Sequence, residues 1–396
     1  MAAPGRVAAA AVAAVLLLGG CTGEPPAPTP THPQWKLAPL PAPPGPPGRL
    51  LVRDAIRCGQ TWYAAGGVAT AAEETRPALW RTADASAASG WASVPVDTAG
   101  DYYAERSVIT ALGCRDGQVA AIGAKSGGAH GNPRVRTFHT GAGGALVAVP
   151  STDFELYGGP RQVSVNRVAG GPGGWLIAGN RQGGAAVWTS PDAALFTIHE
   201  DVPGLASDAG VDTVALDTVA VAGGWVVAGG GRPAGRIDRD PLVWTSADGV
   251  TWARVALPAT SDDEQAQRVV RTPAGVIALG VAGGGFAAWR GDPAGASSWR
   301  SAGRFGATGS GVVAGVESAA LLDGPGRLVA ATTGAGGHDL WVGDPGGDGW
   351  RQVDPPARVG PGGSTALAVA AAGDTMVVLA DDGTAGTLWT SRFQGP

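Results

Sequence analysis

The sequence of 396 residues predicts an all-β protein folded as a seven-bladed β-propeller, and three observations support this prediction. Its 14 tryptophans recur in one register, the register repeats seven times, and many of its 66 glycines separate short apolar runs. The spacing of roughly 45 to 58 residues is typical of one four-stranded propeller blade. The seven copies begin at Trp80, Phe138, Trp188, Trp244, Trp289, Trp341 and Trp389.

Each copy reads as four short strands separated by turn residues. In the fourth copy the apolar, β-branched runs cover residues 213–221, 225–229, 241–246 and 251–255. Glycines and one Asp-Gly pair interrupt these runs, as hairpins between antiparallel strands require. The sequence therefore predicts four antiparallel strands per blade.

The two ends of the repeat region complement each other. The last copy stops at residues 389–393, close to the C-terminus, and lacks a fourth strand. Residues 34–41 around Trp35 resemble a fourth strand that lacks the first three, as a comparison with residues 252–258 shows. We therefore expect residues 34–41 to pair with the last blade and close the ring, which removes open sheet edges.

The N-terminus predicts export and lipidation. After Arg6 comes an apolar run over residues 7–18, which is shorter than the ~20 residues of a membrane-spanning helix and typical of a signal peptide. Residues 18–21, Leu-Gly-Gly-Cys, resemble the lipobox of bacterial lipoproteins. The resemblance implies cleavage before Cys21 and acylation of its thiol and new amino group, which is enough for stable membrane anchoring. An ordinary signal peptide with a cysteine nearby is the alternative.

These features divide the chain into three parts. We expect a lipoprotein signal peptide over residues 1–20, a lipidated, proline-rich tether over 21–47, and the propeller over 48–396. The clustered prolines favour extended polyproline II, a semi-rigid spacer. The predicted location is outside the cytoplasm on the cell membrane.

Charge limits the partners. The chain has a net charge of −5, only 15% of its residues are charged, and no basic run stands out. Nucleic acid is therefore a poor partner. Besides the membrane, we expect a protein, peptide or glycan ligand and a monomeric chain.

One turn carries a family motif. The stretch made of Ser246, Asp248, Gly249, Thr251 and Trp252 resembles the Asp-box, or BNR repeat, of sialidase-like propellers. In that family the box is a structural turn between the third and fourth strands, on the face away from the ligand. A kelch-type propeller is the closest rival, because residues 65–67 and 228–230 repeat the strand-ending glycine pair of that family.

The resemblance does not bring a catalytic set with it. Sialidases use an arginine cluster that grips a carboxylate, a Tyr–Glu nucleophile pair and an acidic Asp, and one arginine belongs to an Arg-Ile-Pro segment that is missing here. The five histidines and the cysteines form no metal-binding spacing. We therefore predict no catalytic residue, no cofactor and no metal site.

Candidate ligand-binding residues lie in connections between blades, on the rim where propellers usually bind ligands. Loops are generally polar, so a purely solvated surface is the alternative reading. Three consecutive acidic residues, Asp262, Asp263 and Glu264, could offer oxygen ligands to Ca²⁺, although this acidic run lacks the spacing of an EF-hand. The candidates are Tyr102, Tyr103, Glu105, Arg106, Glu155, Tyr157, Arg161, Asp262, Asp263 and Glu264.

Two cysteines end the first strands of adjacent blades. Cys58 and Cys114 are therefore expected to lie close together, and an exported protein meets an oxidising environment. We favour a disulfide between them, with free buried thiols as the alternative.

Two functional classes follow. The first is a non-enzymatic, membrane-anchored binding scaffold. The second is a sialidase-like glycoside hydrolase or lyase with a divergent site, because the fold alone does not determine function.

Overall fold

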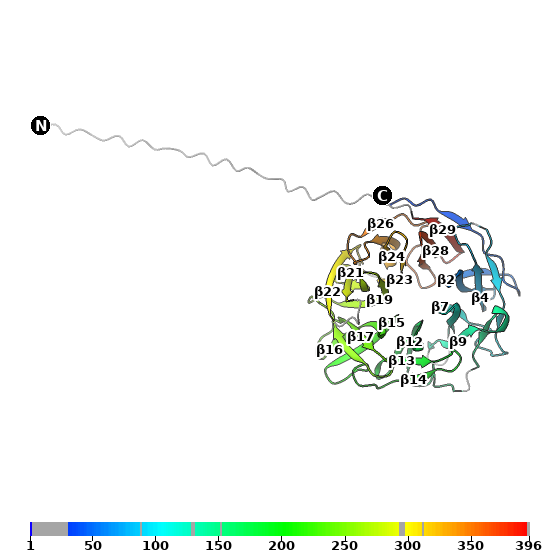
Figure 1. The fold of residues 1–396 in the computed structure, drawn as a ribbon, viewed down its shortest axis with the longest axis horizontal. Coiled ribbons are helices and arrows are strands. Elements are labelled where there is room, and N and C mark those ends of the chain that lie inside the picture. Colours follow the sequence, from blue (N-terminus) through cyan, green and yellow to red (C-terminus); the bar gives the residue numbers. More distant parts are fainter. Residues whose placement is uncertain are drawn as a thin grey trace.

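The computed structural model describes residues 1, 31–87, 89–127, 131–150, 153–292, 298–310 and 313–393. Seven β-sheets form a closed ring around a central channel (Figure 1). Among the described residues, the helical content is limited to 3-10 turns such as η2 (Ala142–Gly144). The described residues contain no helix that is long and apolar enough to cross a membrane. The predicted signal peptide and Cys21 lie outside the described residues.

Each sheet is one blade, and its strands follow one another in sequence from the channel outwards. The first strands, which line the channel, are β2 (Arg49–Cys58), β7 (Val108–Arg115), β11 (Gln162–Gly171), β15 (Val211–Val221), β19 (Glu264–Thr272), β23 (Gly315–Leu322) and β27 (Ala366–Ala372). The second strands are β3 (Thr61–Ala69), β8 (Gln118–Lys125), β12 (Gly174–Arg181), β16 (Gly224–Pro233), β20 (Gly275–Ala282), β24 (Arg327–Gly334) and β28 (Thr375–Asp381).

The outer strands complete the blades. The third strands are β4 (Thr75–Thr82), β9 (Arg134–Thr140), β13 (Gly184–Ser190), β17 (Asp240–Ser246), β21 (Gly285–Gly291), β25 (Gly337–Gly343) and β29 (Gly386–Arg392). The fourth strands are β5 (Ala92–Val94), β10 (Leu146–Ala148), β14 (Thr197–His199), β18 (Ala253–Ala256), β22 (Trp299–Phe305), β26 (Arg351–Val353) and, in blade 7, β1 (Lys36–Ala38). Blade 2 gains a two-residue strand, β6 (Val96–Asp97), parallel to β10. The predicted seven-bladed fold is confirmed.

The N-terminal strand closes the ring, as predicted. Strand β1 pairs antiparallel with β29, so that Leu37 lies opposite Trp389, and the two strands lie side by side in Figure 1. Ala38 is fully buried and belongs to the cluster between blades 7 and 1. Just upstream, the amide of Thr31 donates to Gln352, and the indole of Trp35 donates to the carbonyl of Asp354 at 2.8 Å. The segment therefore joins blades 6 and 7 before the ring begins.

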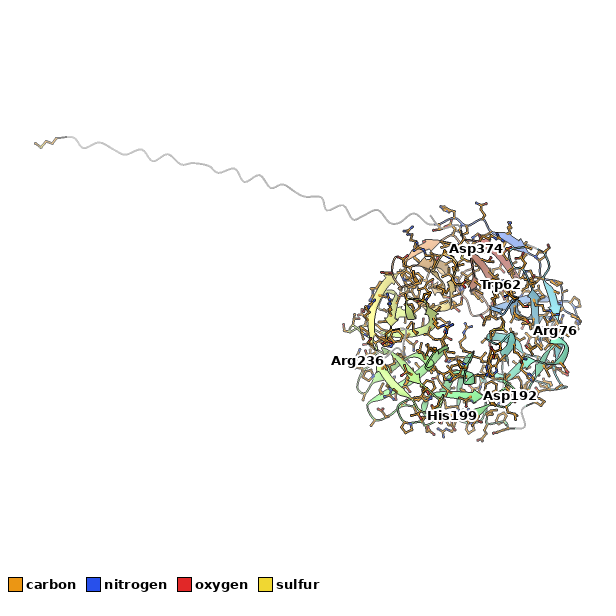
Figure 2. The ribbon with its side chains drawn as sticks, viewed as in Figure 1. Trp62, Arg76, Asp192, His199, Arg236 and Asp374 are labelled. Atoms are coloured by element: carbon orange, nitrogen blue, oxygen red, sulfur yellow. A yellow bond between two sulfur atoms is a disulfide. The ribbon has the colours of Figure 1, made fainter. Side chains whose placement is uncertain are left out.

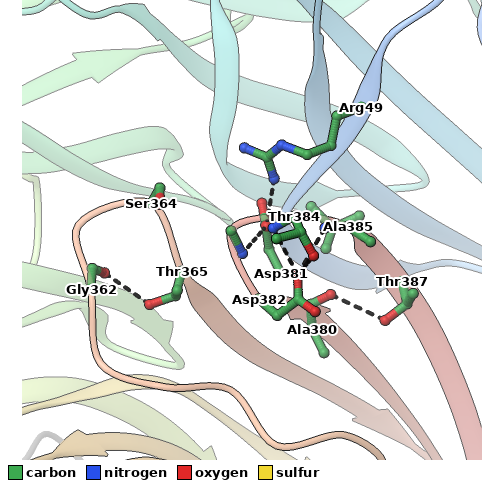
Figure 3. A network of polar contacts seen from close by, with 12 residues as sticks. Arg49, Gly362, Ser364, Thr365, Ala380, Asp381, Asp382, Thr384, Ala385 and Thr387 are labelled. Carbon is green, nitrogen blue, oxygen red and sulfur yellow. Dashed lines mark hydrogen bonds and ion pairs between the residues drawn. The ribbon is translucent and has the colours of Figure 1, made fainter.

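A buried ion pair spans the same junction (Figure 3). Asp381, at the end of β28, is fully buried and accepts from Arg49 at 2.7 Å and from Arg53 at 2.6 Å. Both arginines belong to β2. A buried carboxylate needs a compensating charge, and the two arginines supply it to Asp381. Blade 7 is thus bonded to blade 1 through side chains as well as through β1.

The repeated tryptophan of the third strand packs inside the blade region and makes one hydrogen bond through its indole N–H group. Trp80, Trp188 and Trp244 are completely buried. Their indole N–H groups donate to the carbonyls of Pro41, Leu156 and Gly204, respectively, at 2.7–2.9 Å. Each acceptor lies in the segment that enters the same blade, so the indole fastens that segment to the blade. Tryptophan fits this position because it combines a large apolar area with one donor.

A disulfide links the first strands of blades 1 and 2. The structure bonds Cys58 at the end of β2 to Cys114 in β7, with Cα atoms 5.4 Å apart. The bridge closes a loop of 56 residues, and such bridges typically add ~2–4 kcal/mol to stability.

The Asp-box turn has the structure that the motif predicts. Asp248 accepts the backbone N–H groups of Val250 and Thr251 at 2.8 and 2.7 Å, and Ser246 accepts that of Gly249. These bonds from Thr251 and Val250 hold the pKa of Asp248 well below its usual range. The turn joins β17 to β18 and therefore lies on the same face as the turns from first to second strands.

Closure by residues 34–41 can be tested by replacement. A Gly-Ser segment of equal length in place of residues 34–41 removes the strand and the apolar cover from Ala38, so we expect the melting temperature to fall by roughly 5 °C or more. The same replacement over residues 22–29 serves as the control and should leave the melting temperature unchanged. Equal melting temperatures for the two variants would contradict closure by this segment.

Candidate functional site

The central channel contains a pocket of about 880 Å³ lined by the first strands of all seven blades. Much of its wall is glycine and alanine, which leaves the space open. The charged residues on its wall are Asp54, Arg57, Arg115, Asp116, Arg167, Asp217, Arg268 and Arg271. The channel wall therefore combines many glycine and alanine residues with eight charged side chains.

Bulges in the first strands place these charges. In six blades the register between the first and second strands shifts by one residue, after Val52, Ile109, Val165, Ala215, Ala266 and Val316. A bulge leaves one residue unpaired and redirects the next side chain. The residues that follow the bulge include Asp54, Arg167, Asp217, Arg268 and Ser318, and all five line the pocket. We call these five residues and Glu317 the channel layer.

The carboxylates of the channel layer join neighbouring blades. Asp54 accepts the N–H of Ala55 in its own strand at 3.0 Å and that of Leu112 in blade 2 at 2.8 Å. Asp217 repeats this arrangement with Thr218 at 2.8 Å and with Val269 of blade 5 at 3.0 Å. Each carboxylate therefore satisfies two strand-edge donors that the bulge and the channel leave without a strand partner.

The arginines reach across the channel. Arg167 of blade 3 donates to Asp54 of blade 1 at 3.0 Å and to the carbonyl of Glu317 in blade 6 at 2.9 Å. Arg268 of blade 5 donates to that same carbonyl at 2.8 Å. The carbonyl is available because Glu317 is the bulged residue of β23.

The pKa shifts follow from this packing. Burial alone would lower the pKa of Arg167, but Asp54, Asp217 and Glu317 raise it above the ordinary value. Burial, together with the positive charge of Arg167, lowers the pKa of Arg268 to about 10, so it stays protonated at neutral pH. Burial also raises the pKa of Asp217, although Arg268 and Arg167 oppose that shift. The channel layer is one electrostatically coupled network.

The first predicted rim loop forms a compact turn. Asp101 accepts the N–H groups of Tyr103 and Ala104 at 2.9 and 2.8 Å, and it also pairs with Arg136 at 3.0 Å. The guanidinium of Arg106 lies 3.9 Å from the ring centre of Tyr102 and pairs with Glu105 at 3.1 Å. The loop is therefore held in one conformation by its own side chains.

A second loop meets the first through an arginine. Arg134, at the start of β9, lies 4.7 Å from the ring of Phe154 and 5.9 Å from the ring of Tyr103. Next to it, Pro133 accepts a hydrogen bond from Gln162, the neighbour of Val163. Tyr102, Phe154 and Val163 are 55%, 57% and 51% exposed. We call the surface of Tyr102, Tyr103, Arg106, Arg134, Phe154 and Val163 the loop-face patch; it lies on the face opposite the Asp-box turn.

The other predicted residues of the second loop do not join the patch. Tyr157 is buried against Trp188, its hydroxyl lies 3.5 Å from that of Thr137, and burial raises its pKa. Arg161 instead pairs with Asp201 at 2.5 Å and lies 3.5 Å from Glu200. Glu155 is exposed. Three of the predicted candidates, Glu155, Tyr157 and Arg161, therefore have different environments and do not form one site.

The acidic run of blade 5 is also spread out. Asp262 is exposed, Asp263 accepts the N–H of Arg239 at 2.7 Å, and Glu264 is buried and bonded to Thr260 at 2.7 Å. Within the described residues, no three His, Cys, Asp or Glu side chains come together as a metal site. The run belongs to the start of β19 and its loop.

Sequence reasoning missed the channel layer and the arginine of the patch. The signal for the channel layer is a charged residue at the same position of several apolar first strands, as in residues 51–56, 165–169 and 266–270. Phe154 gave only a weak signal, since it merely precedes Glu155, and Arg134 lies far in the sequence from every predicted residue.

Comparison with known proteins supports the fold. No protein-family model and no curated protein matches the chain. Among solved structures, YCF48 from Cyanidioschyzon merolae is similar with a TM-score of 0.53 and 14% identity, over 90% of this chain and 98% of that one. A puromycin hydrolase complexed with PGG gives a TM-score of 0.51 and 16% identity, over 84% of this chain and 50% of that one.

A sialidase from Trypanosoma rangeli in complex with the inhibitor DANA gives a TM-score of 0.45 and 11% identity, over 88% of this chain and 55% of that one. At these identities, the similarities to YCF48 and to the puromycin hydrolase establish a β-propeller and nothing about activity.

The structural role of the channel layer can be tested with Arg167→Met. The variant leaves Asp54, whose side chain is 10% exposed, without its cation, so we expect the free energy of unfolding to fall by about 3 kcal/mol. Arg236→Met is the matched control, because Arg236 lies at the outer edge of the ring (Figure 2) and pairs with Asp240 near the surface. Its cost should stay below about 1 kcal/mol in the same urea titration. Similar losses in both variants would show that the channel layer does not stabilise the ring.

Proposed function

We propose that the chain is an exported lipoprotein whose propeller serves as a non-enzymatic binding scaffold at the membrane surface. The observation that carries the scaffold part is the state of the channel layer. Asp54 and Asp217, two of the carboxylates on the channel wall, both accept hydrogen bonds from backbone N–H groups of their own and neighbouring strands. Groups engaged in this way hold blades together and are poorly suited to acid–base work.

The loop-face patch supplies the binding surface in this proposal. Exposed Tyr and Phe together with Arg are the residue types enriched where proteins recognise partners. The patch also lies on the face away from the Asp-box turn, which is where the resemblance places the ligand side. The anchor part of the proposal rests on the lipobox-like residues 18–21 and on the proline-rich tether.

The alternative is a divergent sialidase-like glycoside hydrolase or lyase. Glu105 and Glu155 are exposed carboxylates near the patch and are the residues such an activity would use. Glycosidases of this general kind need two carboxyl groups about 5–10 Å apart across a substrate. Glu105 is already engaged in an ion pair with Arg106 at 3.1 Å, which leaves its carboxylate less available to a substrate.

Catalysis can be tested with a panel of fluorogenic glycosides and the full chain. We expect no turnover above buffer, because Asp54 and Asp217 are engaged with backbone N–H groups and Glu105 is paired with Arg106. Turnover that disappears in Glu105→Gln or Glu155→Gln, but persists in the exposed control Glu74→Gln, would replace the scaffold proposal with the glycosidase.

The anchor can be tested separately by Cys21→Ser in a bacterial host. We expect the wild-type chain in the membrane fraction with an acylated N-terminus by mass spectrometry, and the variant in the soluble fraction. The double variant Cys58→Ser/Cys114→Ser serves as a control and should remain membrane-bound. Membrane retention of Cys21→Ser would rule out Cys21 as the anchor.

A further inference from the structure

The loop-face patch gathers apolar surface that the propeller does not use. Tyr102, Phe154 and Val163 come from two loops and from the start of β11, yet all three are more than half exposed. None of the three lines the channel pocket, so the patch is separate from the channel. Exposed apolar side chains that cluster, instead of being scattered, commonly mark a contact site.

Arg134 is the polar centre of this surface and differs from its neighbours. Arg106 and Arg136 have carboxylate partners in Glu105 and Asp101. For Arg134, by contrast, no acid lies within ion-pair distance among the described residues. Its Nε is buried and has no hydrogen-bond acceptor in the described part of the chain. Its contacts are the rings of Phe154 and Tyr103.

An arginine in this state is prepared for a carboxylate. The two aromatic rings fix its planar guanidinium, so little side-chain entropy is lost when an anion binds. A carboxylate that bound the terminal nitrogens of this guanidinium would gain a charge-assisted hydrogen bond in a partly dehydrated place.

We propose that the loop-face patch docks a protein that presents an Asp or Glu side chain flanked by apolar or aromatic side chains. The carboxylate binds Arg134, and the apolar side chains cover Tyr102, Phe154 and Val163. This inference rests on the proposed scaffold function and names the partner class of that surface.

A protein fits this surface better than a glycan does. Glu105 and Asp101, which would accept hydrogen bonds from sugar hydroxyls, are already paired with arginines. The remaining elements are one cation, two aromatic side chains and Val163, and neither Phe154 nor Val163 offers a polar group to a sugar. Tyrosine and arginine are also the residues that most often dominate protein–protein binding energy.

The patch is preorganised for docking. Asp101 holds two amides of the turn and Arg136, and the rings of Tyr102 and Tyr103 meet edge to face at 5.2 Å. A partner therefore orders few side chains on binding, which reduces the entropic cost.

The test is selection of a displayed library of random 12-residue peptides on the full chain, purified in detergent. We expect the enriched peptides to share an Asp or Glu next to an aromatic or aliphatic residue, with affinity that weakens as salt rises. Arg134→Gln should lower their affinity about tenfold, and Tyr102→Ala and Phe154→Ala should each lower it about fivefold or more. Ile237→Ala is the matched control, because Ile237 is 87% exposed in a loop of the same face but in blade 4, and it should bind like wild type.

The outcomes separate this inference from the scaffold proposal. Peptides without a shared acid, equal binding by Arg134→Gln, or no enrichment at all would overturn the docking inference. Binding on a glycan array that depends on Tyr102 and Phe154 would also overturn it and would assign the patch to a glycan. Only glycoside turnover contradicts the scaffold. Unchanged melting temperatures of the exposed-residue variants would show that lost binding does not come from lost folding.

Discussion

Ring closure is the constraint on which the rest of this structure depends. A blade of four strands buries one face against each neighbour, so a propeller has no stable end. Here the end is removed by three residues of β1 beside β29, by the packing of Ala38, and by Asp381 between Arg49 and Arg53. The channel layer exists only because the ring is closed, since its bonds connect blades that are far apart in sequence. The loop-face patch likewise requires blades 2 and 3 to stand side by side.

The channel layer shows how charge can replace apolar packing at the centre of a ring. Seven first strands meet around an open axis, and their inner edges expose backbone donors that have no strand partner. Asp54, Asp217 and Ser318 accept such donors from the next blade, at Leu112, Val269 and Val369. The arginines then balance the carboxylates. Buried ion pairs seldom add net stability, but removal of one partner is costly, which makes the arrangement specific.

Much of the fold could be predicted from the sequence because its strongest signals are local. The aromatic residue of each third strand and the glycine-bounded runs recur from blade to blade, and the turn that resembles an Asp-box lies within one blade. None of these signals requires knowledge of the ring. Closure by residues 34–41 was also predictable, because a missing strand at one end matched an extra strand at the other. The turn after β13 has the same hydrogen bonds: Asp192 accepts from the backbone N–H groups of Ala194 and Leu195.

The candidate site was less predictable because its contacts are long-range or depend on side-chain direction. Arg167 meets Asp54 and Glu317 across 113 and 150 residues of sequence, and only the curvature of the ring brings them together. Tyr157 looks like its neighbours Glu155 and Arg161 in a polar loop, yet its ring turns into the core.

The cross-channel bonds have a consequence for how this protein could change over time. Arg167 spans the distance from blade 3 to blade 1 and to blade 6, and that distance is set by the circumference of seven blades. Duplication of one blade is the simplest way to enlarge a repeat protein, but an eighth blade would widen the axis and separate Arg167 from its acceptors in blades 1 and 6. The hydrogen bonds of Arg167 can therefore form only at the channel width that seven blades produce. An enlarged descendant would have to lose these charges first, whereas a chain that keeps them is held at seven.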